Sequence, residues 1–371
     1  MGSMNVEKVR EDFPITNEVV YLNVANHSPS SRPVQDAIRG FLEDWGRLAR
    51  HGDMRVEEAC RSFARLIGAH PCEVAGQPNT SAGLTMVAEA LPLKRGMNVV
   101  TNDLENPANV YPWLAQRRKG IEVCIIKGEK GAVGIEDVER TVDDRTGALA
   151  ISHVQWLTGA RSDLGAIAEI VHEHGASLVV DGIQSTGSLL VDIRRDDIDF
   201  LACGSYKWLL GPSGAGFLYV REELIEDLEP PFIGYRAVEG HSLEEPRLKG
   251  TAQRLELGEP SYLSFVGTGA AIDVILDVGP ITIEKRVLKL SGLFFKGLPG
   301  LRVEIASPSD EGLRSGVVSF TTEDDRGLYE TLTQVGFIIS LRSAGIRVSP
   351  DFYNTEDEVE RFIEHVRKLI H

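Results

Sequence analysis

The stretch DFLACGSYKWLLGPSGAGFLYV, residues 199–220, places a single lysine between two apolar runs. The runs at 200–205 and 214–220 are continuous rather than alternating, which is typical of strands buried on both faces of a sheet. Lys207 therefore follows the end of one strand and precedes a glycine-rich turn into the next. Because a lysine is usually solvated, this position indicates a specific role for its amine.

Runs of the same kind come earlier in the chain, at 97–103, 122–128, 147–154 and 177–183. A helix is expected between the last two, at 162–175, with Ser162 as its N-cap and Gly175 at its end. Alternating strands and helices predict an α/β fold with a mostly parallel sheet covered by helices. Ligands of such sheets bind beyond the carboxyl ends of the strands.

The pattern changes in the last third of the chain. Residues 225–250 are rich in proline, glycine and charge and read as a long excursion, and one long helix is expected at 264–290. A smaller α+β unit follows, with strands near 301–305, 315–321 and 338–341 and a closing helix at 355–370. We therefore predict an N-terminal arm (1–20) that packs with the small domain, a large domain (21–265), and a linker helix with the small domain (266–371).

Composition excludes several function classes. The 371 residues carry a net charge of −16 without a dense Lys/Arg tract, so nucleic acid and anionic membrane surfaces are not expected partners. No apolar stretch approaches the roughly 20 residues of a membrane span, and MGSMNVEKVREDFP lacks a signal core, so we expect a cytoplasmic protein. The cysteines show no metal-ligand spacing, so we expect reduced thiols and no metal site; they are Cys60, Cys72, Cys124 and Cys203.

Three polar features stand at predicted strand ends. Asp181 ends one strand and is followed by Gln184, His153 ends another, and Lys207 follows a third. Alone, the aspartate would be a turn or cap residue, the histidine a hydrogen-bonded core residue and the lysine a solvated one. Together, on neighbouring strand ends, they indicate a binding or catalytic site.

The segment VVDGIQSTGSLLVDIRRDDIDFLACGSYKWLLGPSGAGFLYV (179–220) resembles the core of class V aminotransferases. These fold-type I enzymes use pyridoxal 5′-phosphate (PLP) and include cysteine desulfurases and isopenicillin N epimerase-like proteins. The similarity extends from YLNVANHSPSSRPV (21–34) to IRVSPDFYNTEDEVERF (346–362). PLP needs a lysine that holds it as an imine and a carboxylate that keeps its ring nitrogen protonated, and Lys207 and Asp181 suit these roles. Burial should lower the pKa of this lysine.

The resemblance also implies the other cofactor contacts. Gln184 would donate to the phenolic oxygen of the ring, with His153 nearby, and QPNTSAGLTMVAEAL (77–91) matches the loop and helix start that bind the phosphate. LELGEPSYLS (255–264) matches a segment that reaches the phosphate of the partner subunit, which implies a homodimer with shared active sites. The implied phosphate contacts are Thr80, Ser81, the Ala82 amide, Ser205, Tyr206 and, across the dimer, Ser261 or Tyr262.

For the substrate, the resemblance assigns Arg347 in IRVSPDFYNT to the α-carboxylate, because a guanidinium matches a carboxylate in geometry and charge. Arg342 is a second candidate. Asn26 and His27 are expected near the substrate end of the site. Trp156 occupies the position at which desulfurases carry an asparagine near the ring oxygen.

The chain departs from the family pattern at two places. ENPANVYPW (105–113) puts Asn106 where the family stacks a histidine or phenylalanine on the cofactor, so stacking should be weaker and no imidazole is present for proton transfer. The segment SLRSAGIRVSPDFYNT (340–355) is short and contains no cysteine. A desulfurase that carries sulfur on a loop cysteine is therefore not expected, and Cys203 is interpreted as a core residue.

These features predict a PLP-dependent enzyme that removes the α-proton of a small amino acid with Lys207. Transamination is the first expectation. The alternatives are elimination of a β- or γ-substituent, possibly with cleavage of a carbon–sulfur bond, and epimerisation. A non-catalytic binding module is disfavoured because Lys207, Asp181 and Arg347 are all present.

Overall fold

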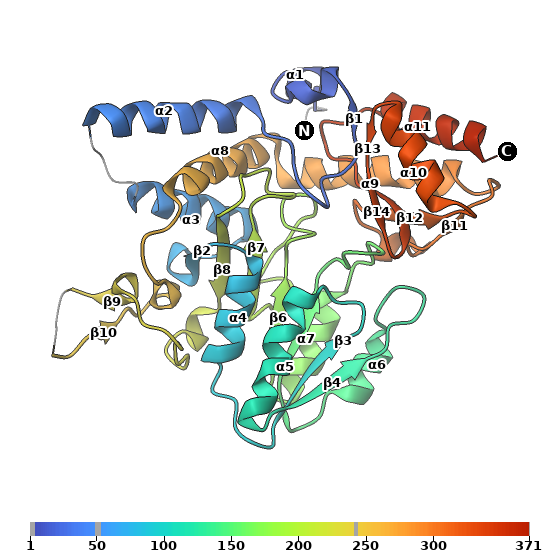
Figure 1. The fold of residues 1–371 in the computed structure, drawn as a ribbon. Coiled ribbons are helices and arrows are strands. Elements are labelled where there is room, and N and C mark those ends of the chain that lie inside the picture. The colour runs from blue at the N-terminus through green and yellow to red at the C-terminus, as the bar shows by residue number, and fades with distance from the viewer. Residues whose placement is uncertain (1–3, 49–52, 241–243, 371) are drawn as a thin grey trace.

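The computed structural model describes residues 4–48, 53–240 and 244–370, and the main sheet within them has seven strands (Figure 1). Strands β4, β3, β5, β6 and β7 are parallel neighbours, and β8 runs antiparallel between β7 and β2. This confirms the predicted mostly parallel α/β sheet. In spatial order the strands are β2 (Val74–Gln77), β8 (Gly216–Val220), β7 (Phe200–Gly204), β6 (Ser177–Asp181), β5 (Thr146–Ser152), β3 (Asn98–Asn102) and β4 (Glu122–Ile126).

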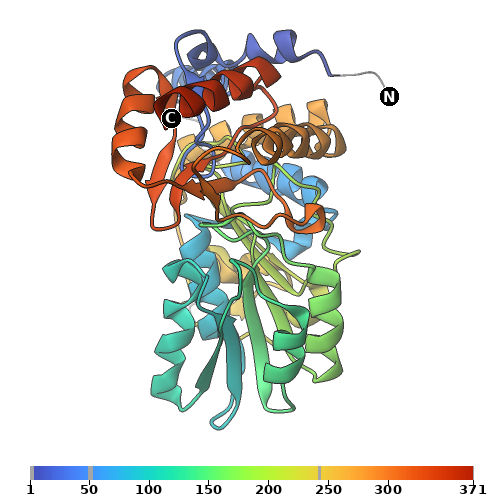
Figure 2. The same ribbon diagram turned by 90° about the vertical axis from the view of Figure 1, so that its right-hand side faces the viewer.

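Helices cover both faces of this sheet (Figure 2). One face packs on α4 (Thr80–Ala90) and α5 (Tyr111–Gln116), and the other on α3 (Asp53–Ile67), α6 (Ile135–Thr141) and α7 (Leu164–Glu173). Successive residues of β6 enter opposite cores, with Leu178 and Val180 on the α7 side and Val179 on the α4 side. The continuous apolar runs therefore reflect burial on both faces.

Helix α7 begins one residue later than predicted from its cap. Asp163 is the N-cap, and its Oδ1 accepts a hydrogen bond from the Ala166 amide at 3.2 Å. The Ser162 hydroxyl instead donates to the Ser152 carbonyl at 3.1 Å. Gly175 lies just past the end of the helix at φ +68°, in the left-handed region that favours glycine.

The single helix predicted at 264–290 is wrong, because two helices occupy this region. These are α8 (Tyr262–Val278) and α9 (Pro280–Gly297), and they meet at an angle of 83°. Gly279 lies at φ +92° between them, and Pro280 lacks the amide that would continue α8. No single helix among the described residues has the length and apolar character to cross a bilayer, and only this bent pair passes that test, by length and composition alone.

The C-terminal unit has a four-stranded antiparallel sheet among the described residues, in the order β11 (Glu304–Ile305), β12 (Val318–Thr321), β15 (Gly345–Val348) and β14 (Ser340–Arg342). It packs on α9, α10 (Asp325–Gln334) and α11 (Glu356–Leu369) through a cluster of phenylalanines. The sequence did not predict β15, which carries Arg347.

The N-terminal residues join this unit. After α1 (Val6–Arg10), β1 (Val20–Tyr21) pairs in parallel with β13 (Phe337–Ile338), and Arg10 forms a 2.8 Å ion pair with Glu358 of α11. Helix α2 (Arg32–Leu48) then runs toward the upper left of Figure 1. The excursion after residue 225 includes a short hairpin of β9 (Val238–Glu239) and β10 (Arg247–Leu248).

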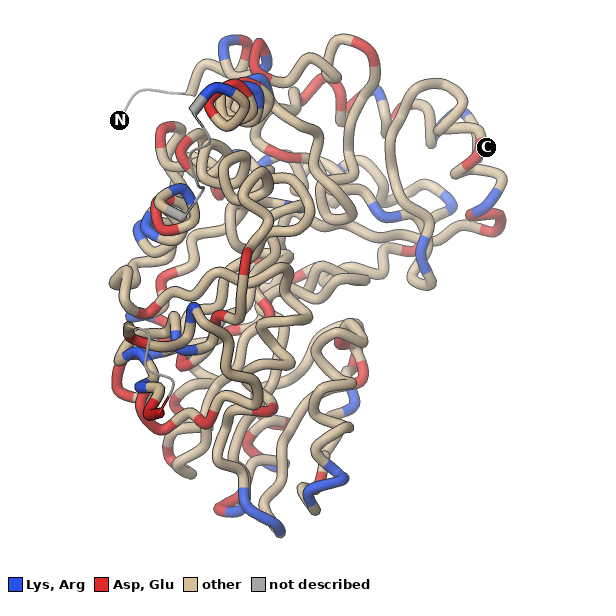
Figure 3. The backbone as a smooth tube through the Cα atoms, turned by 60° about the vertical axis from the view of Figure 1, so that its left-hand side comes forward, with Lys and Arg blue, Asp and Glu red and all other residues tan. Residues whose placement is uncertain are grey.

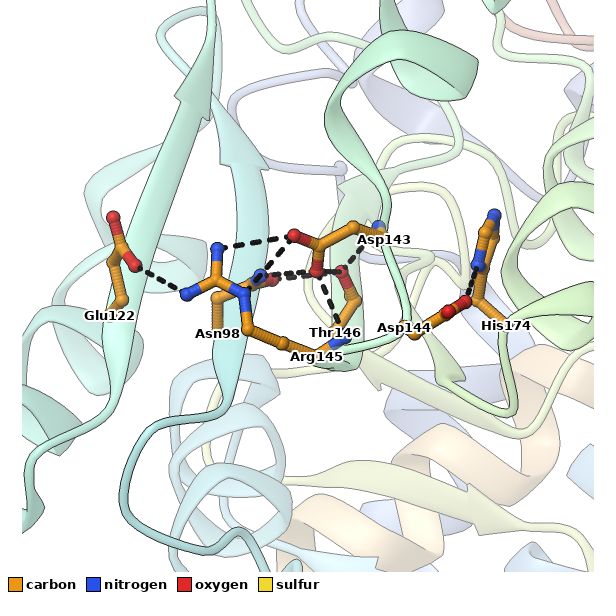
Figure 4. A network of polar contacts seen from close by, with 7 residues as sticks. All are labelled: Asn98, Glu122, Asp143, Asp144, Arg145, Thr146 and His174. Atoms are coloured by element: carbon orange, nitrogen blue, oxygen red, sulfur yellow. Dashed lines mark hydrogen bonds and ion pairs between the residues drawn. The ribbon is translucent and has the colours of Figure 1, made fainter.

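A polar network closes the amino-terminal end of the main sheet (Figure 4). Asn98 Nδ2 donates to Asp143 Oδ1 at 2.8 Å, and the Thr146 hydroxyl donates to Asn98 Oδ1 at 2.8 Å. Asp143 also accepts from Arg145. These contacts hold β3 to β5 at the end of the sheet opposite the carboxyl ends of the strands, where the predicted site residues lie.

Candidate active site at the carboxyl ends of the strands

Strand register brings the predicted site residues together. Asp181 pairs with Ser152 on one side and Ala202 on the other, so His153 and the segment from Ser205 to Lys207 begin at the same level. The His153 amide donates to the Asp181 carbonyl at 3.1 Å. The three strand ends singled out from the sequence therefore form one edge.

Asp181 is a buried acid with only 3% of its surface exposed. Its Oδ1 accepts from the Ile183 amide at 3.0 Å. Burial raises the pKa of Asp181 above its usual range, and nearby Glu105 adds to this, whereas the Ile183 amide and Lys207 oppose it. A carboxyl group with such a raised proton affinity is suited to share a proton with a basic nitrogen.

Lys207 shows the complementary shift. Burial lowers the pKa of its amine, the Asp181 carboxylate opposes that effect, and the positive charges of Arg347 and Arg342 lower the pKa further. Near neutral pH a larger fraction of this amine is uncharged than in a free lysine, so it can act as a nucleophile and as a proton acceptor.

The loop after β7 is held by its own backbone. The Ser205 amide donates to the Ala215 carbonyl at 3.1 Å, and the Gly211 amide donates to the Ser205 carbonyl at 2.9 Å. The Ser205 hydroxyl also points into this loop, where it contacts the Ala215 carbonyl at 2.8 Å. Ser205 therefore does not fit the predicted phosphate contact, because its single O–H is used to close the loop.

Trp208, which the sequence analysis did not single out, orients Gln184. The Trp208 indole N–H donates to Gln184 Oε1 at 2.9 Å, and Gln184 Nε2 donates to the Ala25 carbonyl at 2.9 Å. The amide keeps a second N–H, which fits the predicted contact with a phenolic oxygen. Gly187 permits this packing, since a Cβ there would lie 2.2 Å from the Trp208 carbonyl oxygen.

The start of α4 fits an anion, with one change from the prediction. The N-cap Asn79 accepts from the Ala82 amide at 2.9 Å, so this amide is already engaged. Thr80 Oγ1 accepts from the Gly204 amide at 2.8 Å, which leaves its own O–H to donate. The Ser81 side chain is exposed at the helix start. The first amides of a helix have no partner within it, so Thr80 and Ser81 suit a phosphate.

Glu105 is a second residue that the sequence analysis missed. Its carboxylate is buried and accepts five hydrogen bonds that tie the loop after β3 to the end of β5. The donors are Asn102 Nδ2 (2.8 Å), Asn109 Nδ2 (3.0 Å), the Ser152 amide (2.8 Å), Ser152 Oγ (2.5 Å) and Gln155 Nε2 (2.9 Å). The adjacent Asn106 uses its Oδ1 to cap the next turn through the Ala108 amide at 3.0 Å. The sequence signal that could have identified Glu105 was its position directly before Asn106.

Two orphaned polar atoms lie at the end of β5. His153 is 2% exposed, its Nδ1 is buried without a partner, and burial lowers its pKa to about 3, so the imidazole is neutral. The indole nitrogen of Trp156 is also buried without a partner. Unpaired buried polar groups are costly, so these atoms fit a region that binds a polar ligand.

The two candidate arginines differ in depth. Arg347 is 2% exposed, its Nη1 donates to the Trp156 carbonyl at 2.6 Å, and its Nε is buried without a partner. Burial, followed by Arg342, lowers the pKa of Arg347 to about 10. Arg342 is half-buried, and its Nη2 donates to Asn26 Oδ1 at 2.8 Å.

The remaining predicted residues lie around the site loop. His27 Nε2 is 3.4 Å from Ser213 Oγ, and the His27 ring is 5.6 Å from the Tyr206 ring, centroid to centroid. Ser261 and Tyr262 begin α8, where Ser261 Oγ is 2.7 Å from Ser264 Oγ. Their predicted action in a partner subunit stays a prediction.

Together these side chains have the chemistry that PLP requires. They are a buried acid, an amine of lowered pKa, a helix start with a free hydroxyl, and unpaired buried donors.

Residues 20–362 match the family model described as Aminotransferase class-V. A probable cysteine desulfurase of Pyrococcus abyssi is 29% identical over 98% of this chain and 97% of its own. A cysteine desulfurase of Salmonella gallinarum is 32% identical over 98% of both chains.

Other comparisons agree. The uncharacterized aminotransferase YcbU of Bacillus subtilis is 30% identical over 98% of both chains. The apo structure of a cysteine desulfurase from Thermococcus onnurineus superposes with a TM-score of 0.91 at 29% identity, covering 100% of this chain and 99% of that one. The chain therefore belongs to the class V aminotransferase family and is a PLP-dependent enzyme.

Proposed function

We propose that the enzyme breaks a carbon–sulfur bond in a cysteine-type amino acid by β-elimination, with Lys207 as the base that removes the α-proton. The observation that best supports this chemistry is a pair of buried groups whose pKa values shift in opposite directions. Burial lowers the pKa of Lys207 and raises the pKa of Asp181. The relatives named cysteine desulfurases support a substrate with a carbon–sulfur bond. Their names move this reaction, an alternative in the sequence analysis, ahead of transamination.

When bound, PLP would supply an electron sink for the electron pair left at Cα. Lys207 would hold the cofactor, and its Nζ would accept the α-proton of the substrate. Asp181 would hold a proton at the ring nitrogen, and Gln184 would donate its second N–H to the phenolic oxygen. The Thr80 hydroxyl and the first amides of α4, other than the engaged Ala82 amide, would bind the phosphate, and Arg347 would bind the α-carboxylate of the substrate.

The sulfur leaves without a protein carrier in this proposal. With L-cysteine, the α-proton goes to Lys207, the C–S bond breaks with its electron pair on sulfur, and the thiolate takes up a proton. Water completes the balance, so that cysteine and water give pyruvate, ammonia and hydrogen sulfide with no external oxidant or reductant. Cys203 is a poor sulfur acceptor because burial raises the pKa of its thiol, and residues 340–355 contain no cysteine.

Transamination is the second candidate, favoured by the relative named an aminotransferase and by the same base at Lys207. The PLP-loaded enzyme should be incubated with L-cysteine alone, and with S-substituted cysteines, while pyruvate and thiol or sulfide are followed over time. β-Elimination predicts both products over many turnovers without a keto acid. One equivalent of keto acid per site, followed by arrest until a second keto acid is added, would replace elimination by transamination.

Two variants sharpen the assay. Lys207→Ala should abolish product release. The double variant Cys72→Ala/Cys124→Ala should keep product release, because both cysteines lie at the edges of the sheet and the site lies on its central strands. Cys72 precedes β2 at one edge, and Cys124 lies in β4 at the other. Alanine formation from cysteine that depends on a protein cysteine would contradict the proposed route.

A further inference from the structure

The segment from Asn23 to Ser28 borders the candidate site. Gln184 Nε2 donates to the Ala25 carbonyl at 2.9 Å, and the Ser28 amide donates to the Tyr206 carbonyl at 2.9 Å. Asn26 and His27, between these two contacts, are exposed. This segment is therefore fastened to the Gln184 and Lys207 loops on one side and reaches solvent on the other.

The small domain brings two arginines to the candidate site from adjacent strands. Arg347 of β15 lies deep, against the Trp156 carbonyl at 2.6 Å. Arg342 of β14 lies nearer to solvent and is held at Asn26 by a 2.8 Å hydrogen bond. The strands are paired, which fixes the two arginine backbones relative to each other, and the side chains lie at two depths, Arg347 buried and Arg342 half-buried.

Within the described part of the chain, the hydrogen-bond acceptors of these arginines do not neutralise their charge. Arg347 donates to a backbone carbonyl, and Arg342 donates to the Leu341 carbonyl at 3.0 Å and to a side-chain amide oxygen. All three acceptors are neutral. Both positive charges act on the site, since each lowers the pKa of Lys207. The α-carboxylate of one amino acid neutralises only one guanidinium, and a partly desolvated cation is stabilised by an anionic partner.

We propose that the substrate carries a second anionic group at the end of its side chain, and that Arg342, oriented by Asn26, binds it while Arg347 holds the α-carboxylate. The substrate class is then an S-substituted cysteine that ends in a carboxylate. This inference rests on the proposed function for the identity of the bond that breaks. The recognition of charge by Arg342 is separate from that chemistry and can be measured separately.

Binding to the PLP-loaded Lys207→Ala protein tests it without turnover. Two nearly isosteric probes, S-carboxymethyl-L-cysteine and S-carbamoylmethyl-L-cysteine, differ in the charge of the terminal group. By isothermal titration calorimetry, the carboxylate probe should bind about tenfold more tightly, as expected for one charge-assisted hydrogen bond. Adding Arg342→Gln should remove this preference, and Arg342→Lys should keep most of it. Arg302→Gln, at an exposed position of the small domain, is the charge-matched control and should leave it unchanged.

The outcomes separate the two proposals. A preference that Arg342→Gln abolishes supports a second anionic group even if the wild-type enzyme transaminates both probes, which would overturn elimination alone. Pyruvate and thiol released equally well from both probes, with equal affinities, would overturn the inference while leaving elimination in place. A carboxylate preference that survives in Arg342→Gln would also overturn it, because the second anion would then bind elsewhere.

Discussion

Burial shifts the acid and the base of the site in opposite directions. Asp181 and Lys207 both lose water, so the carboxyl group gains proton affinity and the amine loses it. Each charged form would be unfavourable alone in this environment. The opposing shifts suit an acid that holds a proton at a ring nitrogen and an amine that accepts one from Cα.

Removal of the deep arginine should weaken substrate binding more than turnover. Arg347→Ala should raise KM for the amino acid roughly 10²-fold, because a buried charge-assisted pair contributes about 2–4 kcal/mol. Arg347→Lys should recover part of the loss, since a lysine keeps the charge but not the planar fork. Steady-state kinetics on the three proteins measure this effect, and an unchanged KM in Arg347→Ala would place the α-carboxylate elsewhere.

Glu105 should position the loop of Asn106 and tune the site electrostatically. Glu105→Gln places an NH2 group where hydrogen-bond donors now converge, at a cost of about 1–3 kcal/mol in the free energy of unfolding. It also removes a negative charge that raises the pKa of Asp181. We expect the pH-dependent change in the cofactor absorbance to move to lower pH. Glu122→Gln, at an exposed position of β4, is the control, and identical titrations in all three proteins would show that Glu105 has no electrostatic role.

Helix α7 is fastened to the sheet by a histidine between two aspartates. His172 Nε2 is 2.8 Å from Asp199 and Nδ1 is 3.0 Å from Asp197, and the hydrogen bond with Asp199 is the main cause that raises the pKa of His172. A histidine with a raised folded-state pKa stabilises the fold fully below its unfolded value of about 6.5. That contribution is lost as pH rises through the folded-state pKa.

His172→Gln should therefore reduce the free energy of unfolding by about 0.5–1 kcal/mol at roughly pH 5.5 and by much less at about pH 9. Urea unfolding at the two pH values measures the difference. His174→Gln removes a contact to exposed Asp144 and serves as a surface control with little effect. An equal loss at both pH values would mean that packing, not charge, accounts for the role of His172.

Prediction from sequence worked best for elements whose burial is evident from a continuous run of neighbouring apolar residues. The strands ending at Asp181 and Gly204 were identified because both faces are apolar, and their ends located the site. The prediction of one helix at 264–290 was wrong because the apolar pattern continues through Gly279. The backbone break at that residue divides the segment into two helices. Glu105 and Trp208 were missed because their partners, Ser152 and Gln184, are distant in sequence. Strand β15 was missed because the pairing with β12 and β14 that defines it is also tertiary.

One side of the molecule carries the surface expected of a subunit interface. Large apolar side chains are exposed on α2, on α3 and near the β9–β10 hairpin, which all lie toward the left of Figure 1. Figure 3 turns this side forward and shows acidic and basic residues interspersed along it. Ser261 and Tyr262, the residues predicted to reach a partner's phosphate, follow the exposed Leu257. The exposed apolar residues of these segments are Leu42, Trp45, Met54, Phe232, Ile233, Tyr235 and Leu257.

We therefore expect a homodimer whose stability is linked to cofactor affinity. Trp45→Asp should favour the monomer in sedimentation velocity, because it places a charge in an apolar interface, and should weaken PLP binding at least about tenfold. Val335→Asp, on an exposed apolar position beside α10, is the matched control and should change neither. A wild-type monomer that holds PLP tightly would exclude shared active sites.

Lys207 is expected to hold the cofactor covalently, and chemical reduction of the bound enzyme tests this role. The PLP-loaded enzyme is reduced with borohydride, digested and mapped by mass spectrometry, which identifies the lysine that holds the cofactor. We expect one phosphopyridoxyl group per chain, on the peptide that contains Lys207, and its loss in Lys207→Ala. Stoichiometric labelling of another lysine, or labelling that survives in Lys207→Ala, would contradict it.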